Sequence, residues 1–312
     1  DNKIRRSILF DSKADFLIYG MAEKSILEFA EAIKNHQDVS NIRGLCYISK
    51  AEKNDYIQLP SFEEVSKSNT KFIEMFEIFY SNNEPSSSKG LCQKTGDRYL
   101  IHNPPHFYPT QSELDSYFEL DFEYDAHPFY KQKGKINALE TIKQSIISHR
   151  GCFGECNFCA IAIHQGRKVV SRSVQSIVRE AQIISSKPDF NGIIYDVGGP
   201  SANMYGMDCK QLNEHCNARR CLYPQKCKNL SNNHNNYLKL LEEIAKIPKI
   251  RKIFISSGIR FDLALNDKVN GEKFIRLLAE KYVSGQLKIA PEHISNNVLS
   301  AMGKKVNKED IT

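Results

Sequence analysis

Hydrophobic residues in the second half of the chain alternate between short continuous runs and longer stretches with helical spacing. Four continuous runs predict strands that are buried on both faces: 142–148, 192–197, 252–257 and 287–290. Three stretches with apolar residues three and four positions apart predict the intervening helices: 174–184, 238–245 and 274–282. Because strands and helices alternate, we expect a parallel sheet covered by helices, as in a βα barrel.

The beginning of the chain shows a shorter version of the same pattern. An apolar strand covers 14–19, helical spacing covers 26–33, and a second strand covers 45–48. This order predicts a parallel βαβ unit, and we interpret residues 1–50 as part of a doubly wound α/β domain. Residues 51–140 lack a clear period and contain several prolines, so we interpret them as a linker or wrap between domains.

Residues with functional chemistry follow the predicted strands of the second half. A cysteine loop follows the first strand, Gly198-Gly199-Pro200 follows the second, and the last two lead to Arg260 and to Glu292 with His293. In a βα barrel the functional residues collect at the carboxyl ends of the strands. We therefore interpret residues 141–312 as a barrel with a cysteine-rich insertion at 203–234. Four strands are too few to close a barrel, so the barrel is expected to be incomplete and the chain truncated at both ends.

Composition narrows the classes of protein that fit. Charged residues make up 26% of the chain. No apolar run approaches the roughly 20 residues of a membrane span, so we expect a cytoplasmic protein without a membrane segment. The formal charge of +6 comes from 43 basic and 37 acidic residues that are interleaved along the chain. Such mixing is typical of a solvated surface, while a basic face for nucleic acid stays open as an alternative.

Cysteine is the residue type that carries most information. Seven of the nine cysteines lie between Cys152 and Cys227, in a chain that shows no secretory signal. This setting favours metal or cluster ligation in a reducing compartment over a disulfide framework.

Cys152, Cys156 and Cys159 have the spacing C-x3-C-x2-C directly after a predicted strand. Zinc ribbons and ferredoxin-type clusters use four protein ligands. Three thiolates would leave one iron of a 4Fe–4S cluster free to bind a substrate or cofactor, which favours such a cluster here. A zinc site with a distant fourth ligand and three buried cysteines without a ligand role are the alternatives.

Four further cysteines follow the Gly-Gly-Pro strand end: Cys209, Cys216, Cys221 and Cys227. The segment between them is polar and is interpreted as an irregular loop with little apolar content. A metal bound by four thiolates would order such a loop, so we predict a second site for zinc or an auxiliary iron–sulfur cluster. The spacing is not a standard zinc pattern, and free or redox-active thiols are the alternative.

The first cysteine motif, with Phe158 before its last cysteine, resembles that of the radical S-adenosylmethionine (radical SAM) superfamily. Longer runs are similar to the YgiQ-type members of that superfamily: His149-Arg-Gly-Cys-Phe-Gly-Glu-Cys-Asn-Phe-Cys-Ala160, His164-Gln-Gly-Arg167, Gly198-Gly-Pro-Ser-Ala-Asn-Met-Tyr205, Ser257-Gly-Ile-Arg260 and Ala290-Pro-Glu-His293. The resemblance covers most of the chain. It implies a cobalamin-binding-like α/β domain ahead of a radical SAM barrel.

The resemblance also implies roles for residues at the strand ends. A 4Fe–4S cluster on the three cysteines would hold S-adenosylmethionine and cleave it reductively to methionine and a 5′-deoxyadenosyl radical. Phe158 would lie near the adenine. Gly198, Gly199 and Pro200 would contact the methionine amino group, although Pro200 replaces the acidic residue of the superfamily's motif. Arg167, Arg172 or Arg260 would bind the methionine carboxylate. Glu292 would bind the ribose hydroxyls, and His293 would exchange protons with the substrate.

The implied cofactors are the cluster, S-adenosylmethionine and a second metal centre, with cobalamin as an open candidate. The implied partner is a reductant such as a flavodoxin or ferredoxin, and the substrate is not implied. A two-cluster electron-transfer protein and a zinc-stabilised RNA-binding module are the rival classes. The open ligand position and the Gly-Gly-Pro strand end favour the enzyme over both.

Overall fold

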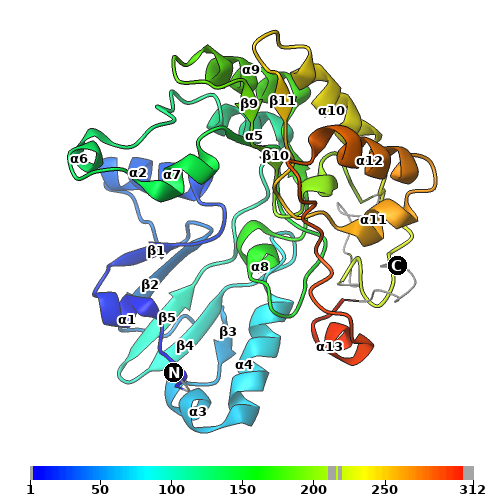
Figure 1. Ribbon diagram of the computed structural model, residues 1–312. Coiled ribbons are helices and arrows are strands. Elements are labelled where there is room, and N and C mark those ends of the chain that lie inside the picture. The colour runs from blue at the N-terminus through cyan, green and yellow to red at the C-terminus, as the bar shows by residue number, and fades with distance from the viewer. Residues whose placement is uncertain (1–2, 210–215, 217–219, 305–312) are drawn as a thin grey trace. The chain divides into compact units, whose positions relative to one another are not determined.

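The computed structural model describes residues 3–209, 216 and 220–304, and the chain divides into two compact units. The first unit spans Asp1–Tyr108 and the second spans Pro109–Thr312 (Figure 1). Each unit combines a sheet with helices. Every helix in the described ranges is too short or too polar to cross a membrane.

The first unit is built on a five-stranded sheet with the strand order β1-β2-β5-β4-β3. Its strands are β1 (Phe16–Ile18), β2 (Leu45–Ser49), β3 (Ile57–Leu59), β4 (Leu91–Thr95) and β5 (Arg98–His102). The pair β3–β4 is parallel and the other neighbours are antiparallel. The tight β4–β5 turn uses Gly96 at a φ of 62°, which a glycine adopts without strain.

Four helices accompany this sheet: α1 (Ile8–Ser12), α2 (Glu23–Lys34), α3 (Phe62–Lys67) and α4 (Asn69–Ser81). The first turn of α3 is closed by a capping box, in which Ser61 and Glu64 satisfy each other's backbone N–H groups. Ser68 ends α3 and caps α4, so the two helices follow each other without a linker.

The predicted parallel βαβ unit over 14–50 is corrected by this sheet. Both predicted strands and the helix are present, but β1 and β2 are antiparallel, with Ile18 opposite Leu45. The reason lies in the loop between α2 and β2. A helix of 12 residues spans about 18 Å, whereas ten residues of loop reach about 33 Å when extended. The loop can therefore return the chain to the end of the sheet from which it left.

The predicted linker over 51–140 is also corrected. Residues 51–108 supply β3, β4 and β5, and β5 pairs directly with β2, so these residues complete the first sheet. Cys92, within the predicted linker, lies fully buried in β4. The sequence pattern misses β4 because polar residues interrupt its apolar run, and one of them, Gln93, is buried in the strand.

Parallel strands organise the second unit. They are β6 (Ser145–Ile147), β9 (Ile193–Ile194), β10 (Asp196–Gly198) and β11 (Lys252–Ile253), and an antiparallel pair is formed by β7 (His149–Arg150) and β8 (Val170–Ser171). β6 pairs with β10, and β9 pairs with β11, both in parallel. A parallel bridge joins Ile259 to Ile289, so the fourth predicted strand contributes one bridge.

The predicted helices of the second unit are confirmed as α9 (Val174–Ser186), α10 (Asn235–Ala245) and α12 (Gly271–Leu277), the last continued by η2 (Leu278–Tyr282). The other helical segments are α5 (Gln111–Tyr117), α6 (Pro128–Lys131), α7 (Asn137–Ile142), α8 (Ile161–Gln165), η1 (Ala202–Met204), α11 (Phe261–Asn266) and α13 (Asn296–Ala301). The core joins the strands to α9 and α10 through fully buried residues such as Ile146, Ile177, Val197, Tyr237 and Leu241. The predicted α/β alternation is therefore confirmed.

Candidate active site

The cysteine loop connects β7 to α8 and begins at a position that only glycine can occupy. Gly151 has a φ of 86°, and a Cβ at this position would stand 1.9 Å from the carbonyl oxygen of Lys168. Phe153, at 1% exposure, anchors the loop in an apolar cluster. The backbone N–H of Cys159 donates to the carbonyl of Cys156 at 3.0 Å, which turns the loop back on itself.

Gly154 keeps space open between two of the thiols. A Cβ built on Gly154 would lie 3.3 Å from Cys152 Sγ and 3.5 Å from Cys156 Sγ. The backbone N–H of Gly154 also donates to Cys152 Sγ at 3.3 Å. Burial raises the pKa of both thiols, and the positive charge of Arg260 acts in the opposite direction. All nine cysteines are free thiols.

Arg260 is brought to the cysteine loop from the third strand end. It is 5% exposed, and its Nη1 lies 3.7 Å from Cys156 Sγ. Its Nε and Nη2 both donate to the carboxylate of Asp262, while the amide of Asn203 holds its backbone on both sides. Burial alone lowers the pKa of Arg260, but Asp262 and the thiols raise it overall, so the guanidinium is a fixed cation.

The fourth strand end reaches the same place. Glu292 accepts a hydrogen bond from Lys304 Nζ at 2.8 Å, and Lys304 Nζ also lies 5.9 Å from the centre of the Phe158 ring. Phe158 is half exposed, with its ring free of the apolar core. His293 plays a local part, because its Nδ1 accepts from the backbone N–H of Ser295 just before α13. Two strand ends therefore meet the cysteine loop, one through Arg260 beside Cys156 and the other through Glu292 and its partner Lys304.

Close packing explains the glycine pair at the second strand end. A Cβ on Gly198 would stand 2.5 Å from Ser257 Oγ, and one on Gly199 would stand 2.6 Å from the His149 ring. Asp196 organises the neighbouring strand end, since its carboxylate accepts from the backbone N–H groups of Ser256 and Ser257. The contact of Gly198, Gly199 and Pro200 with a cofactor stays a prediction.

The structure separates the remaining arginine candidates. Arg167 is mostly buried beside the loop, with Nη1 3.8 Å from Glu155 Oε2. Arg172 is fully buried, and its N–H groups bind Glu180, Ser176 and the carbonyl of Ile147. These contacts tie α9 to β6 and leave no donor for a ligand, so the expectation that Arg172 binds the cofactor is wrong.

Sequence reasoning missed the residues that support the site, namely Asn203, Asp262 and Lys304. Asp262 stands two residues from Arg260, and this short spacing could have indicated the pair. Asn203 and Lys304 carry no local signal. Each reaches the site only because distant segments pack together.

The second cysteine set lies against the first one. Cys209 and Cys221 belong to the apolar cluster of Phe153, and Cys152 and Cys227 pack against that cluster. Burial raises the pKa of Cys221 to about 12. The expectation of a loop with little apolar content is corrected, because Leu222 and Leu230 are buried there as well. Residues 210–215 and 217–219, between these cysteines, lie outside the described ranges.

Within the described ranges, no three His, Cys, Asp or Glu side chains gather closely enough to hold a metal ion. A second metal site on Cys209, Cys216, Cys221 and Cys227 therefore stays a prediction. Cys152, Cys156 and Cys159 are predicted to bind a cluster and not a single ion. In a cluster each thiolate binds a different iron, so the three sulfurs need not converge on one point. Two soft thiol donors at the space beside Gly154, a third on the same short loop and a cation next to Cys156 fit a 4Fe–4S cluster.

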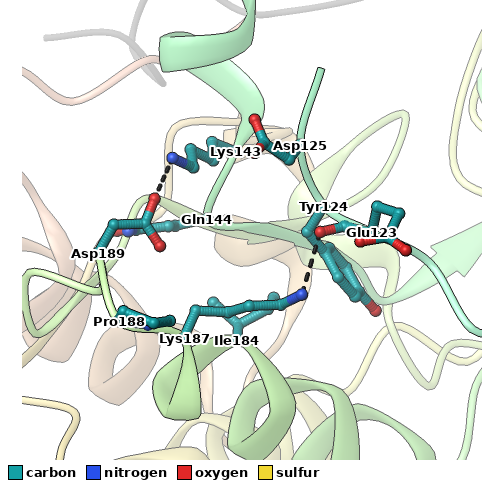
Figure 2. A pocket seen from close by; sticks show the side chains of 9 residues that line it. All are labelled: Glu123, Tyr124, Asp125, Lys143, Gln144, Ile184, Lys187, Pro188 and Asp189. Atoms are coloured by element: carbon teal, nitrogen blue, oxygen red, sulfur yellow. Dashed lines mark hydrogen bonds and ion pairs between the residues drawn. The ribbon is translucent and has the colours of Figure 1, made fainter. Parts of the chain in front are cut away.

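A cavity of about 280 Å³ lies at the other end of the parallel strands, just before β6 and β9 (Figure 2). It is lined by Glu123, Tyr124, Asp125, Lys143, Gln144, Ile184, Lys187, Pro188 and Asp189. Its lysines already bind neighbours, Lys143 the carboxylate of Asp189 and Lys187 the carbonyl of Glu123 (Figure 2). This cavity is separate from the cysteine site, because Gln144 precedes β6 whereas the cysteines follow β7.

Comparison with known proteins defines the class. The model of the family described as the radical SAM superfamily matches residues 146–312, and that of the radical SAM N-terminal family matches residues 1–145. The chain belongs to the radical SAM superfamily. Within it, the chain is 52% identical over 305 residues to a UPF0313 protein of Fusobacterium nucleatum, with 97% of this chain and 54% of that protein covered. This similarity confirms the predicted YgiQ-type resemblance.

Two further similarities complete the picture. A UPF0313 protein of Clostridium botulinum is 45% identical over 311 residues, which cover 97% of this chain and 48% of that protein. The chain thus spans about half the length of these curated relatives. A solved structure of the radical SAM methyltransferase TsrM from Kitasatospora setae, with cobalamin and a 4Fe–4S cluster bound, matches with a TM-score of 0.46 and 15% identity. The match covers 97% of this chain and 43% of TsrM.

Proposed function

We propose that this chain is part of a radical SAM enzyme that holds a 4Fe–4S cluster on Cys152, Cys156 and Cys159 and cleaves S-adenosylmethionine reductively. The observation that carries the proposal is the cysteine loop itself, with Gly154 keeping the space between two thiols open and Arg260 Nη1 at 3.7 Å from Cys156 Sγ. When bound, the cluster supplies one electron to the sulfonium of S-adenosylmethionine, giving methionine and a 5′-deoxyadenosyl radical.

The chain's own residues would prepare this chemistry. Arg260 offsets the negative charge of the thiolates from a position that Asp262 and Asn203 fix. The half-exposed ring of Phe158 would lie near the adenine, and the partly exposed carboxylate of Glu292 would hold the ribose hydroxyls. The carbonyls around Gly198 and Gly199 would accept from the methionine amino group. Arg167 and His293 remain candidates for the carboxylate and for proton exchange.

The electron would come from a small reductant such as a flavodoxin or ferredoxin in the cytoplasm, where nine free thiols are stable. Cobalamin stays an open candidate for this chain. The resemblance implies a cobalamin-binding-like first domain, whereas the sheet of the first unit is largely antiparallel. The substrate is left open by this proposal, as is a role for nucleic acid.

The test is anaerobic reconstitution of the wild-type chain and of Cys156→Ala with iron and sulfide. Iron and sulfide are counted, and 5′-deoxyadenosine is measured after S-adenosylmethionine and dithionite are added. We expect at least four irons per chain and 5′-deoxyadenosine from the wild type. Cys156→Ala should lose 5′-deoxyadenosine and about four of those irons, because a cluster on two thiolates is labile. Cys92→Ala, in the sheet of the first unit, is the matched control and should behave as the wild type.

The rival classes give different outcomes in the same experiment. A wild-type cluster without 5′-deoxyadenosine would indicate an electron-transfer protein. Stoichiometric zinc in place of iron would indicate a zinc-stabilised binding module. Full turnover by Cys156→Ala with normal iron content would contradict the ligand assignment itself.

A further inference from the structure

Lys304 is a buried ammonium group next to the cysteine loop. Its side chain is 3% exposed, which is unusual for lysine unless the charge is paired. Its Nζ donates to the carbonyl oxygen of Ala290 and to Glu292 Oε1, both at 2.8 Å. The Glu292 carboxylate is 33% exposed, so the pair has its positive member inside and its negative member at the surface of the site.

The cysteine loop itself holds Lys304 in place. Asn157, between Cys156 and Phe158, donates through its backbone N–H to the carbonyl of Met302 at 2.9 Å and through Nδ2 to the carbonyl of Ala301 at 2.7 Å. Gly303 lets these segments approach, since a Cβ there would stand 3.0 Å from Asn157 Oδ1. The turn that carries Lys304 is therefore fixed to the same loop that carries the thiols.

The strand end that carries Glu292 is fixed as well. Ile289 forms a parallel bridge with Ile259, and the N–H of Ala290 donates to the carbonyl of Ile259 at 3.1 Å. Glu292 adopts a φ of 64°, a conformation that is unfavourable for a non-glycine residue and persists where the surroundings determine it. Both members of the pair thus have positions set by the backbone.

The pair also acts on the thiols electrically. Lys304 Nζ lies 5.9 Å from the centre of the ring of Phe158, the neighbour of Cys159, and Glu292 Oε1 lies 2.8 Å from the same Nζ. Lys304 and Glu292 therefore have opposite effects on negative charge at the cysteine loop. Arg260, with Nη1 3.7 Å from Cys156 Sγ, adds a second positive charge beside this ligand and has its own ion-pair partner, Asp262.

We propose that Lys304 and Glu292 are positioning residues that together set the reduction potential of the cluster held by Cys156. The inference rests on the proposed function, since it requires a cluster. Reduction adds one negative charge to the cluster, and nearby charge is one of the features by which proteins tune such potentials. Lys304 stabilises the reduced state, Glu292 destabilises it, and the ion pair keeps the two effects in balance.

The test is a redox titration of the reconstituted cluster without S-adenosylmethionine, followed by electron paramagnetic resonance, in Lys304→Met, Glu292→Gln and the double variant. Lys304→Met should lower the ratio of reduced to oxidised cluster at a fixed potential about tenfold. A unit charge has an effect of this order across roughly 10 Å at an effective dielectric constant of about 20. For a one-electron couple that ratio corresponds to a shift of about 59 mV.

Glu292→Gln should shift the ratio in the opposite direction, and the double variant should return close to the wild type. Lys304→Arg, which keeps the charge, should also stay close to the wild type. Lys239→Met removes a matched charge from an exposed position on α10 and should leave the potential unchanged. A merely structural pair would instead give two single variants that shift in the same direction, with the double variant shifted furthest.

Shifts of equal sign in the two single variants, or no shift in either with normal iron content, would overturn the inference. If Lys304→Met loses the cluster, the other two single variants decide. A raised potential in Glu292→Gln together with a wild-type potential in Lys304→Arg supports the inference. An unchanged potential in Glu292→Gln overturns it. Failure of the wild-type chain to take up iron and sulfide would overturn the proposed function, and the inference with it.

Discussion

His149 illustrates how a single residue is defined by burial. It is fully buried between the first strand and the cysteine loop, and its Nδ1 lies 2.9 Å from Ser148 Oγ. Its Nε2 has no hydrogen-bond partner among the described residues. Burial lowers the pKa of His149 to about 4, so the ring is neutral at physiological pH and stands against Gly199 as an apolar surface.

A pH dependence of stability follows from this neutral ring. The unfolded chain protonates His149 near its ordinary pKa of about 6.5, whereas the folded chain does so near 4. The contribution of His149 to the free energy of unfolding is therefore fully present above pH 6.5. It falls by roughly 3 kcal/mol as the pH drops towards 4. We expect His149→Asn to lose this dependence. Urea denaturation at pH 7, 5.5 and 4.5 checks it, and parallel curves for both proteins would contradict it.

Gly199 makes a second residue-scale prediction, because its contact with the His149 ring leaves no room for a methyl group. Gly199→Ala would place a carbon 2.6 Å from a ring that is itself fully buried, so we expect a loss of about 1–3 kcal/mol in the free energy of unfolding. Gly258→Ala is the control, since the nearest described atom would be 3.8 Å away. Equal stability of the two variants in thermal denaturation would show that the ring moves aside.

Helix α9 shows how one element is fixed to the sheet. Ser173 caps its first turn, and its buried face carries Ile177, Ala181 and Ile184 into the core. Arg172, just before the helix, binds the carboxylate of Glu180 two turns further on and stacks on Phe118 at 4.0 Å. The fully buried pair connects the start of α9 to its middle and, through the carbonyl of Ile147, to β6.

Breaking this buried pair should destabilise the second unit strongly. Glu180→Gln leaves the charge of Arg172 buried without a counter-ion, so we expect a loss of about 3 kcal/mol or more. Glu119→Gln is the matched control, because its pair with Arg179 is exposed on both sides and should change stability by about 0.5 kcal/mol or less. Chemical denaturation measures both. Similar losses of stability in the two variants would contradict the expectation that the buried ion pair contributes more than the exposed one.

At the scale of elements, the sequence predicted which segments are helices and which are strands, but it did not predict whether neighbouring strands are parallel or antiparallel. The strands at 192–197 and 252–257 and the helix at 174–184 are where the hydrophobic period placed them, because burial on one or two faces imposes that period. The antiparallel pairing of β1 with β2 left no such mark. A strand has the same pattern in either direction, and the loop that decides the direction carries no period.

At the scale of the whole molecule, cluster binding should protect segments that lie far apart in sequence. We expect hydrogen exchange to slow on reconstitution in residues 151–160, 258–262 and 290–304, because contacts through Arg260, Asn157 and Lys304 join them. Exchange in β2, β4 and β5 of the first unit should stay unchanged. Mass spectrometry of the apo and reconstituted chain measures this, with Cys156→Ala as the control. Protection confined to residues 151–160 would contradict the expectation that the three segments form one site.

The sequence by itself determined the class of this protein. Three cysteines in eight residues after an apolar strand are a local pattern, and the glycines and arginines that follow the later strands are local as well. Their chemistry depends on residue type and spacing, which folding does not alter. The superfamily, the cysteine triad and the placement of Arg260 and Glu292 at strand ends were therefore predictable.

Only the tertiary structure decided which of those residues meet and what supports them. It removed Arg172 from the site by burying it against α9, and it brought Lys304 to the cysteine loop through Asn157, whose contact with Ala301 spans 144 positions. It also joined residues 51–108 to the first sheet. The physical reason is common to all three. Pairing and burial of charge depend on contacts between distant segments, and neither residue type nor local period specifies such contacts.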